Sequence, residues 1–222
     1  MAEYTVEIRN AFGRFFASPD YTPLVLAQVI DTGNIAHSPT GGAVFNTTIP
    51  AGNKCVAFCK INDSVASCLF EVFNNGGVKA IRIKASTGGS YLNCRFYVFA
   101  DYLTYIPDYG IFIYNSAGRI VYTGNCLPLN IKYYTRGSAE SGVPSASVGG
   151  FSHMTSSGIP GQQGEFIYAV LSYVGYSGGV RSIPYYVNTG TSSLPDFGST
   201  PGCSYIETAI YDQYYKQSLG LS

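Results

Sequence analysis

Residues 109–131 read YGIFIYNSAGRIVYTGNCLPLNI, and residues 4–26 read YTVEIRNAFGRFFASPDYTPLVL. The two stretches align without a gap at a spacing of 105 positions, and seven of the 23 aligned residues are identical. Self-similarity at a fixed spacing is typical of repeated structural units. The chain is therefore predicted to contain one unit twice. The identities are Tyr4/Tyr109, Ile8/Ile113, Asn10/Asn115, Gly13/Gly118, Arg14/Arg119, Pro23/Pro128 and Leu24/Leu129.

The repeated stretch has the pattern of a β-hairpin. Residues 6–9 alternate between apolar and charged side chains, which is the period of a half-buried strand. Asn10 and Gly13, like Asn115 and Gly118, are typical of a turn, because Asn favours its first position and Gly accepts a positive φ at its end. The apolar pair after each turn begins a returning strand. The Pro-Leu pair that follows predicts the start of a third strand.

Short apolar segments separated by Gly, Ser, Asn and Pro clusters fill the rest of the chain, at the spacing of a β-sandwich. We therefore expect an all-β protein of two tandem sandwich-like domains, 1–105 and 106–222, with the boundary near residues 105–108. Residues 135–165 are expected to form a long exposed loop. The tail 206–221 is compatible with helix or strand, and no helix is expected in the rest of the chain. Further strands are expected at 43–48, 54–61, 68–73, 78–84, 94–102, 165–174, 180–187 and 205–211.

The charge composition points to a chain that meets other proteins. Lys and Arg number 13, Asp and Glu number 13, and charged residues make up only 12% of the chain. A soluble protein usually has about twice that fraction, and surface charge keeps free monomers apart. The low charge predicts an oligomer or an assembly subunit, and the missing basic excess argues against nucleic-acid binding. No apolar run approaches the length of a membrane-spanning helix, and no secretory leader is expected at the N-terminus.

Cysteine, histidine and acidic residues give no recognisable reaction or metal site. Without a secretory leader, the six cysteines are expected to be reduced, and only Cys55 and Cys59 approach zinc-ligand spacing. His37 and His153 have no nucleophile motif around them. The acidic residues are scattered, and no glycine loop for phosphate is present. We therefore expect no catalytic residue, no metal, no cofactor and no enzymatic activity.

The stretch Tyr109-Gly-Ile-Phe-Ile-Tyr-Asn-Ser-Ala-Gly-Arg-Ile-Val-Tyr-Thr resembles a hairpin found in small tail proteins of tailed bacteriophages. Residues 4–26 are a degenerate copy of it. The resemblance covers about 25 residues and carries no catalytic residue. It implies a structural virion protein of the distal tail, baseplate or tail fibre. It also implies assembly in the bacterial host cytoplasm and other tail proteins as partners.

Two sets of residues are candidates for contacts. Arg14 and Arg119 follow the turn glycines, where a charge either protects an edge strand or lies at a junction between repeats or subunits. The second hypothesis is a receptor-binding or carbohydrate-binding module on the tail tip, in which aromatic rings stack on a sugar or contact a host surface receptor. Its candidate residues are Tyr173, Tyr176, Tyr185 and Tyr186.

Overall fold

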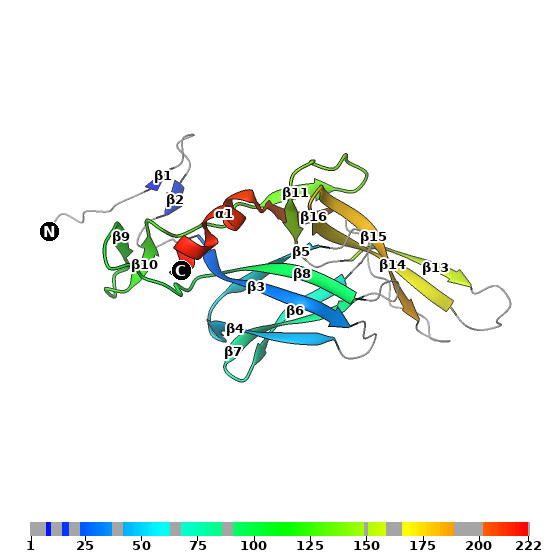
Figure 1. The fold of residues 1–222 in the computed structure, drawn as a ribbon, viewed down its shortest axis with the longest axis horizontal. Helices are drawn as coiled ribbons and strands as arrows, with labels where there is room; N and C mark the ends of the chain where they lie inside the picture. Colours follow the sequence, from blue (N-terminus) through cyan, green and yellow to red (C-terminus); the bar gives the residue numbers. More distant parts are fainter. Residues whose placement is uncertain are drawn as a thin grey trace.

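The computed structural model describes residues 8–9, 15–17, 23–36, 42–62, 68–85, 91–148, 151–158, 166–188 and 202–221. Its strands form several mainly antiparallel sheets, and one short helix lies near the C-terminus (Figure 1). The all-β prediction is therefore confirmed.

The two predicted hairpins are present and have the same register. Strand β1 (Ile8–Arg9) pairs with β2 (Phe15–Ala17), and β9 (Phe112–Tyr114) pairs with β10 (Ile120–Thr123). Ile8 lies opposite Ala17, and Ile113, 105 positions after Ile8, lies opposite Tyr122. Each hairpin skips one residue of its returning strand at the same place, which is a β-bulge.

Strands β3 to β8 form a two-sheet sandwich. One sheet has the order β3 (Val25–Ala36), β8 (Tyr91–Ala100), β5 (Cys55–Ile61), and the other has the order β4 (Ala43–Pro50), β7 (Val78–Ala85), β6 (Cys68–Asn75). Figure 1 shows β4, β6 and β7 lying along one side of β3 and β8. Alternate residues of β5 and β8 point between the sheets and form the main core with Ile49, Ile81 and Ile83. The strands predicted at 43–48, 54–61, 68–73 and 78–84 are therefore present within one or two residues.

The opposite face of the β3-β8-β5 sheet is also buried. Its residues Phe58, Tyr97 and Phe99 are 0% exposed, and helix α1 (Ala209–Leu219) covers them with Tyr211 and Tyr215. The tail therefore resolves to a helix, and strand β16 (Gly202–Glu207) ends before it. The strand predicted at 205–211 is wrong beyond Glu207.

The second half of the chain joins the same sheet. β11 (Lys132–Thr135), β16 and β12 (Ser145–Ser147) pair in that order, and β12 meets β5 where Ser147 lies opposite Cys59. A three-stranded meander of β13 (Phe151–Gly158), β14 (Phe166–Tyr176) and β15 (Gly179–Asn188) also meets β5, through Gly175 and Lys60. Two tandem sandwiches are not confirmed, because residues on both sides of position 105 share one sheet and one buried cluster.

The prediction of one long exposed loop at 135–165 is wrong for its middle. Ser145, Ala146 and Ser147 are at most 1% exposed, and residues 151–158 form β13. Their burial follows from a close approach of two backbones. A Cβ atom on Gly175 of β14 would lie 2.5 Å from the Cα of Ala146. Only small residues fit where β12 and β14 lie this close. The segment 145–147 therefore has no pattern of large apolar residues that would predict its burial.

Candidate assembly surface

Hairpin β9–β10 has two buried apolar residues, and large apolar residues just before it in the chain are exposed. Ile113 and Tyr122 are 4% and 8% exposed, and they pack with Val25. Tyr109 and Ile111, which come just before β9 in the chain, are 86% and 70% exposed. A two-stranded sheet has little stability of its own, because each strand leaves one edge unpaired. Among the described strands, the hairpin therefore offers both an unpaired backbone edge and, beside it, exposed apolar side chains.

These exposed side chains lie in the segment before β9 and in β9 itself. We define the hairpin patch by its five large apolar residues with exposed fractions between 38% and 86%: Tyr105, Ile106, Tyr109, Ile111 and Tyr114. Scattered exposed apolar residues are common, but monomeric proteins rarely expose apolar patches of more than a few hundred Å². A concentration of this kind in ten consecutive residues is typical of a protein contact.

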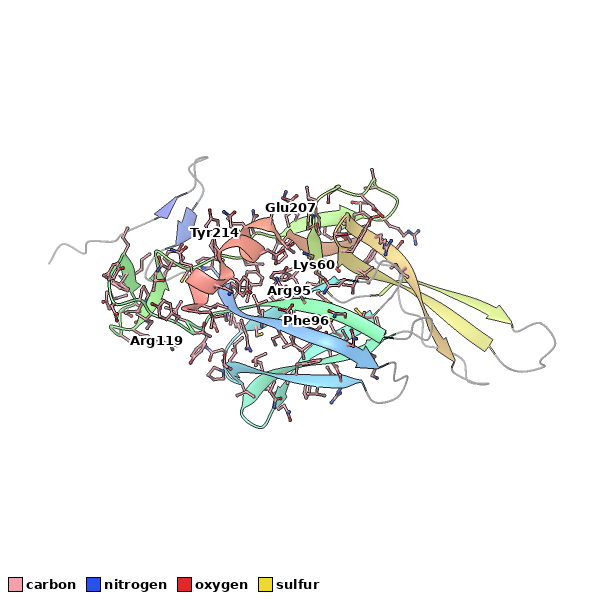
Figure 2. The ribbon with its side chains drawn as sticks, in the orientation of Figure 1. Lys60, Arg95, Phe96, Arg119, Glu207 and Tyr214 are labelled. Carbon is pink, nitrogen blue, oxygen red and sulfur yellow. The ribbon has the colours of Figure 1, made fainter. Side chains whose placement is uncertain are left out.

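The turn of β9–β10 is rigidly built. The Asn115 side-chain Oδ1 accepts hydrogen bonds from the backbone N–H groups of Ala117, at 3.1 Å, and Arg119, at 2.9 Å. Gly118 takes a φ of 74°, which an Asn-x-x-Gly turn requires. Arg119 thus has its backbone fixed and its side chain exposed at the tip of the hairpin (Figure 2). This position suits a contact residue. Arg14 lies outside the described residues.

A second apolar area lies beside β11. Among the described strands, β11 pairs only with β16, so its other edge is open. Ile131, Tyr133 and Ile210 are 54%, 58% and 53% exposed, and we call these three residues the edge patch. Ile210 also lines a hollow of about 190 Å³ together with Lys132. Open strand edges with apolar neighbours accept an additional strand from a partner. In Figure 1 the hairpin and β11 lie on opposite sides of α1.

Helix α1 is held to the sheet by a polar cluster centred on Asp212. The Tyr97 hydroxyl donates to the Asp212 carboxylate at 2.5 Å, Arg95 donates at 3.0 Å and Lys60 at 3.2 Å. Arg95 also makes a two-pronged contact with Asp31, at 2.7 and 2.8 Å. Figure 2 shows Lys60 and Arg95 between the sheet and the helix.

The charges in this cluster are balanced within the protein. Burial alone would raise the pKa of Asp212, but the Tyr97 hydrogen bond and the cations Lys60 and Arg95 outweigh it and lower the pKa. Burial and the hydrogen bond to Asp212 raise the pKa of Tyr97. With its charges partnered, the cluster anchors α1 to the sheet.

The two candidate tyrosines whose side chains the structure describes, Tyr173 and Tyr176, do not form an open platform. Tyr173 is 2% exposed and packs with Val180 and Cys203, so its ring is not open to a sugar. Tyr176 hydrogen-bonds to Glu140 and carries the Arg181 guanidinium 4.2 Å from its ring centre. The strands place Tyr185 and Tyr186 in β15, and their side chains lie outside the described residues.

The two histidines cannot be placed relative to other reactive side chains. His37 and the side chain of His153 lie outside the described residues. Across the part of the chain that the structure describes, no group of three or more His, Cys, Asp or Glu side chains is placed to hold a metal ion. The same part contains no helix with the length and apolar character needed to cross a membrane.

The exposed apolar residues that the sequence reasoning missed are those of the hairpin patch and the edge patch. The unbroken run Tyr109-Gly-Ile-Phe-Ile-Tyr114 carried a usable signal, because a strand with one buried face should alternate with polar residues. The sequence around Ile131 and Ile210 carried no such signal. Comparison with protein-family models, with curated proteins and with solved structures found no match to this chain.

Proposed function

We propose that this chain is a non-enzymatic structural protein of a bacteriophage tail, part of the distal tail, baseplate or tail fibre. It acts by assembling with other tail proteins, as an oligomer in the particle. It is made in the host cytoplasm and resides in the virion tail.

The observation that carries this proposal is the exposed apolar hairpin. The same residues that resemble phage tail hairpins, 109–123, include Tyr109 and Ile111, which are 86% and 70% exposed. Burying such side chains against a neighbour stabilises an interface by about 25 cal/mol for each Å² removed from water. The low charge of the chain is compatible with the same neighbour.

The edge patch adds a second contact area on the same subunit. A protein with two different contact areas binds its neighbours head to tail, and it forms closed rings or filaments according to the rotation between copies. Tail rings and fibres are built in this way. The hairpin patch and the edge patch would thus bind different neighbours.

Immunogold electron microscopy of the phage that encodes this chain tests the proposal. An antibody raised against the purified chain should label the tail end of intact particles, and mass spectrometry should find the chain in purified tails. A chain that is abundant in infected cells but missing from purified particles would contradict the virion role.

A tyrosine-lined hollow supports the receptor-binding or carbohydrate-binding alternative. Tyr133, Tyr134 and Tyr205 line about 130 Å³ together with Ser138 and Ser141. Exposed rings beside hydroxyl groups are the usual elements of a sugar site. Binding of host polysaccharide that Tyr133→Ala abolishes and Tyr214→Ala preserves would favour this alternative. Binding unaffected by both substitutions would exclude the hollow.

A further inference from the structure

Two short strands, β9 and β11, each have one open edge. Among the strands that the structure describes, β9 pairs only with β10, and β11 pairs only with β16. Large apolar side chains lie at both edges, since Tyr114 in β9 is 51% exposed, and Ile131 and Tyr133 at β11 are 54% and 58% exposed. In Figure 1 the two strands lie on opposite sides of α1, so they do not pair within one copy of the chain.

The hydrogen bonds of the hairpin identify the backbone groups that β9 leaves free. The carbonyl of Ile111 accepts a hydrogen bond from the Gly124 N–H at 2.9 Å, so Ile111 is turned toward the β10 side. In an antiparallel pair, successive residues alternate between facing the partner strand and facing away from it. Ile113 therefore also faces β10. The N–H and C=O groups of Phe112 and Tyr114 point to the open side.

The same reasoning identifies the free backbone groups of β11. On the neighbouring strand β16, the Ser204 carbonyl accepts a hydrogen bond from the Val148 N–H at 3.0 Å, so Ser204 is turned toward the β12 side. The next residue, Tyr205, therefore faces β11, where it lies opposite Lys132. Lys132 is thus turned toward β16. The N–H and C=O groups of Tyr133 point to the open side, and so do those of Ile131.

We propose that β9 of one copy pairs antiparallel with β11 of a second copy, and that this pairing joins the copies head to tail. The free backbone groups meet when Phe112 lies opposite Tyr133 and Tyr114 lies opposite Ile131. Tyr114 and Ile131, which are both exposed in the single copy, then become direct cross-strand neighbours. The inference rests on the assembly role proposed above, and it names the neighbour as another copy of this chain.

Two opposite charges favour the antiparallel direction. Asp108 lies just before β9, Arg136 directly follows β11, and both are exposed. No hydrogen bond or ion pair joins either side chain to another residue in the part of the chain that the structure describes. Antiparallel pairing brings the start of β9 to the end of β11, so the two charges approach each other. Parallel pairing would instead bring Arg136 toward Arg119 at the hairpin turn, and like charges oppose docking.

Charge reversal in the purified full chain tests this pairing. In sedimentation velocity, the wild type should form species heavier than the monomer, in a proportion that grows with concentration. Asp108→Arg and Arg136→Asp place like charges at the contact, and each variant alone should associate at least about tenfold more weakly. An equimolar mixture of the two variants restores opposite charges at both contacts and should associate as the wild type does. Lys216→Asp, an equal charge change at an exposed residue of α1, is the control and should assemble normally.

A second pair of variants tests the backbone hydrogen bonds. Tyr114→Pro removes the N–H that points to the open side, a position where an edge strand tolerates proline, and Tyr114→Ala keeps it. Circular dichroism should show that both variants fold, and the proline variant should associate more weakly than the alanine variant.

Four results would overturn the pairing: a wild type that is monomeric at every concentration, reversed-charge variants that assemble normally, a mixture no heavier than its components, or equal association of the Tyr114→Pro and Tyr114→Ala variants. All four concern the purified chain alone. They are therefore separate from the virion role, which electron microscopy of the particles tests.

Discussion

The backbone N–H of Leu129 donates a 2.8 Å hydrogen bond to the carbonyl of Leu24, and these two leucines are the aligned residues of the two similar stretches. Leu26 donates to Leu127 in the same way, also at 2.8 Å. The two stretches therefore pair antiparallel with each other, directly after their hairpins. Between these bonds, Val25 and Pro128 form a pair of opposite residues that do not hydrogen-bond to each other. The pairing therefore tolerates proline at position 128, because no backbone N–H is required there.

Removing the Leu129 donor should loosen this junction. Leu129→Pro deletes the N–H as well as the leucine side chain, and it should lower the free energy of unfolding by about 1–3 kcal/mol more than Leu129→Ala does. Leu129→Ala keeps the hydrogen bond and loses part of a half-buried side chain, at a cost of about 1–2 kcal/mol. Urea unfolding compares the two variants. Equal losses would show that the hydrogen bond to Leu24 contributes nothing.

Asp212 should be the most important acidic residue for stability. Asp212→Ala removes the shared acceptor of Tyr97, Lys60 and Arg95, and we expect a loss of about 2–3 kcal/mol. This is below the loss for a fully buried pair, because the Asp212 side chain is 28% exposed. The matched control is Glu71→Ala, which breaks an exposed contact with Arg82 and should cost less than about 1 kcal/mol. Thermal unfolding of both variants checks the difference.

The same carboxylate should make stability depend on pH. The folded pKa of Asp212 is lowered from its ordinary value of 3.8, so its contribution is present above that value. It is lost as the pH falls from about 4 toward the lower folded pKa. The difference in unfolding free energy between wild type and Asp212→Asn should therefore shrink across this range. A difference that stays constant from pH 6 to pH 2 would contradict the lowered pKa.

Tyr211 should couple α1 to the junction of the two stretches. Its buried hydroxyl donates to the Pro128 carbonyl at 2.9 Å and accepts from the Asn130 N–H at 3.1 Å. Tyr211→Phe leaves both backbone groups without this partner and should cost about 1–3 kcal/mol. Tyr214→Phe, on the exposed side of the same helix, is the control and should be neutral. Hydrogen exchange should show faster exchange at Asn130 in Tyr211→Phe alone.

Local features of this fold were predictable, and its long-range pairing was not. Asn115 and Gly118 mark a turn by their own conformational preferences, and residues 81–84 alternate between apolar and charged side chains, which is the period of a strand. The meeting of Ser147 with Cys59 joins residues 88 positions apart, and nothing near either residue indicates it. Both predicted hairpins exist with one register, yet the segments after them follow different paths.

The helix and the contact patches show two further limits. Residues 209–219 are rich in tyrosine, which favours strands in isolation, and the helix is stabilised by packing Tyr211 and Tyr215 against the sheet. Tyr173 and Tyr109 belong to the same residue type, but their exposed fractions are 2% and 86%. Composition alone cannot separate a buried ring from one that is available to a partner.

The molecular mass in solution, alone and with the purified tail proteins of the same phage, tests the assembly role most directly. Sedimentation velocity should show a defined oligomer or a complex for the wild type. The double variant Tyr109→Ser/Ile111→Ser should be a folded monomer, and Val44→Ser, at an exposed site on β4, should behave as the wild type. A wild type that stays monomeric with every tail protein, or a double variant that assembles normally, would contradict assembly through the hairpin patch.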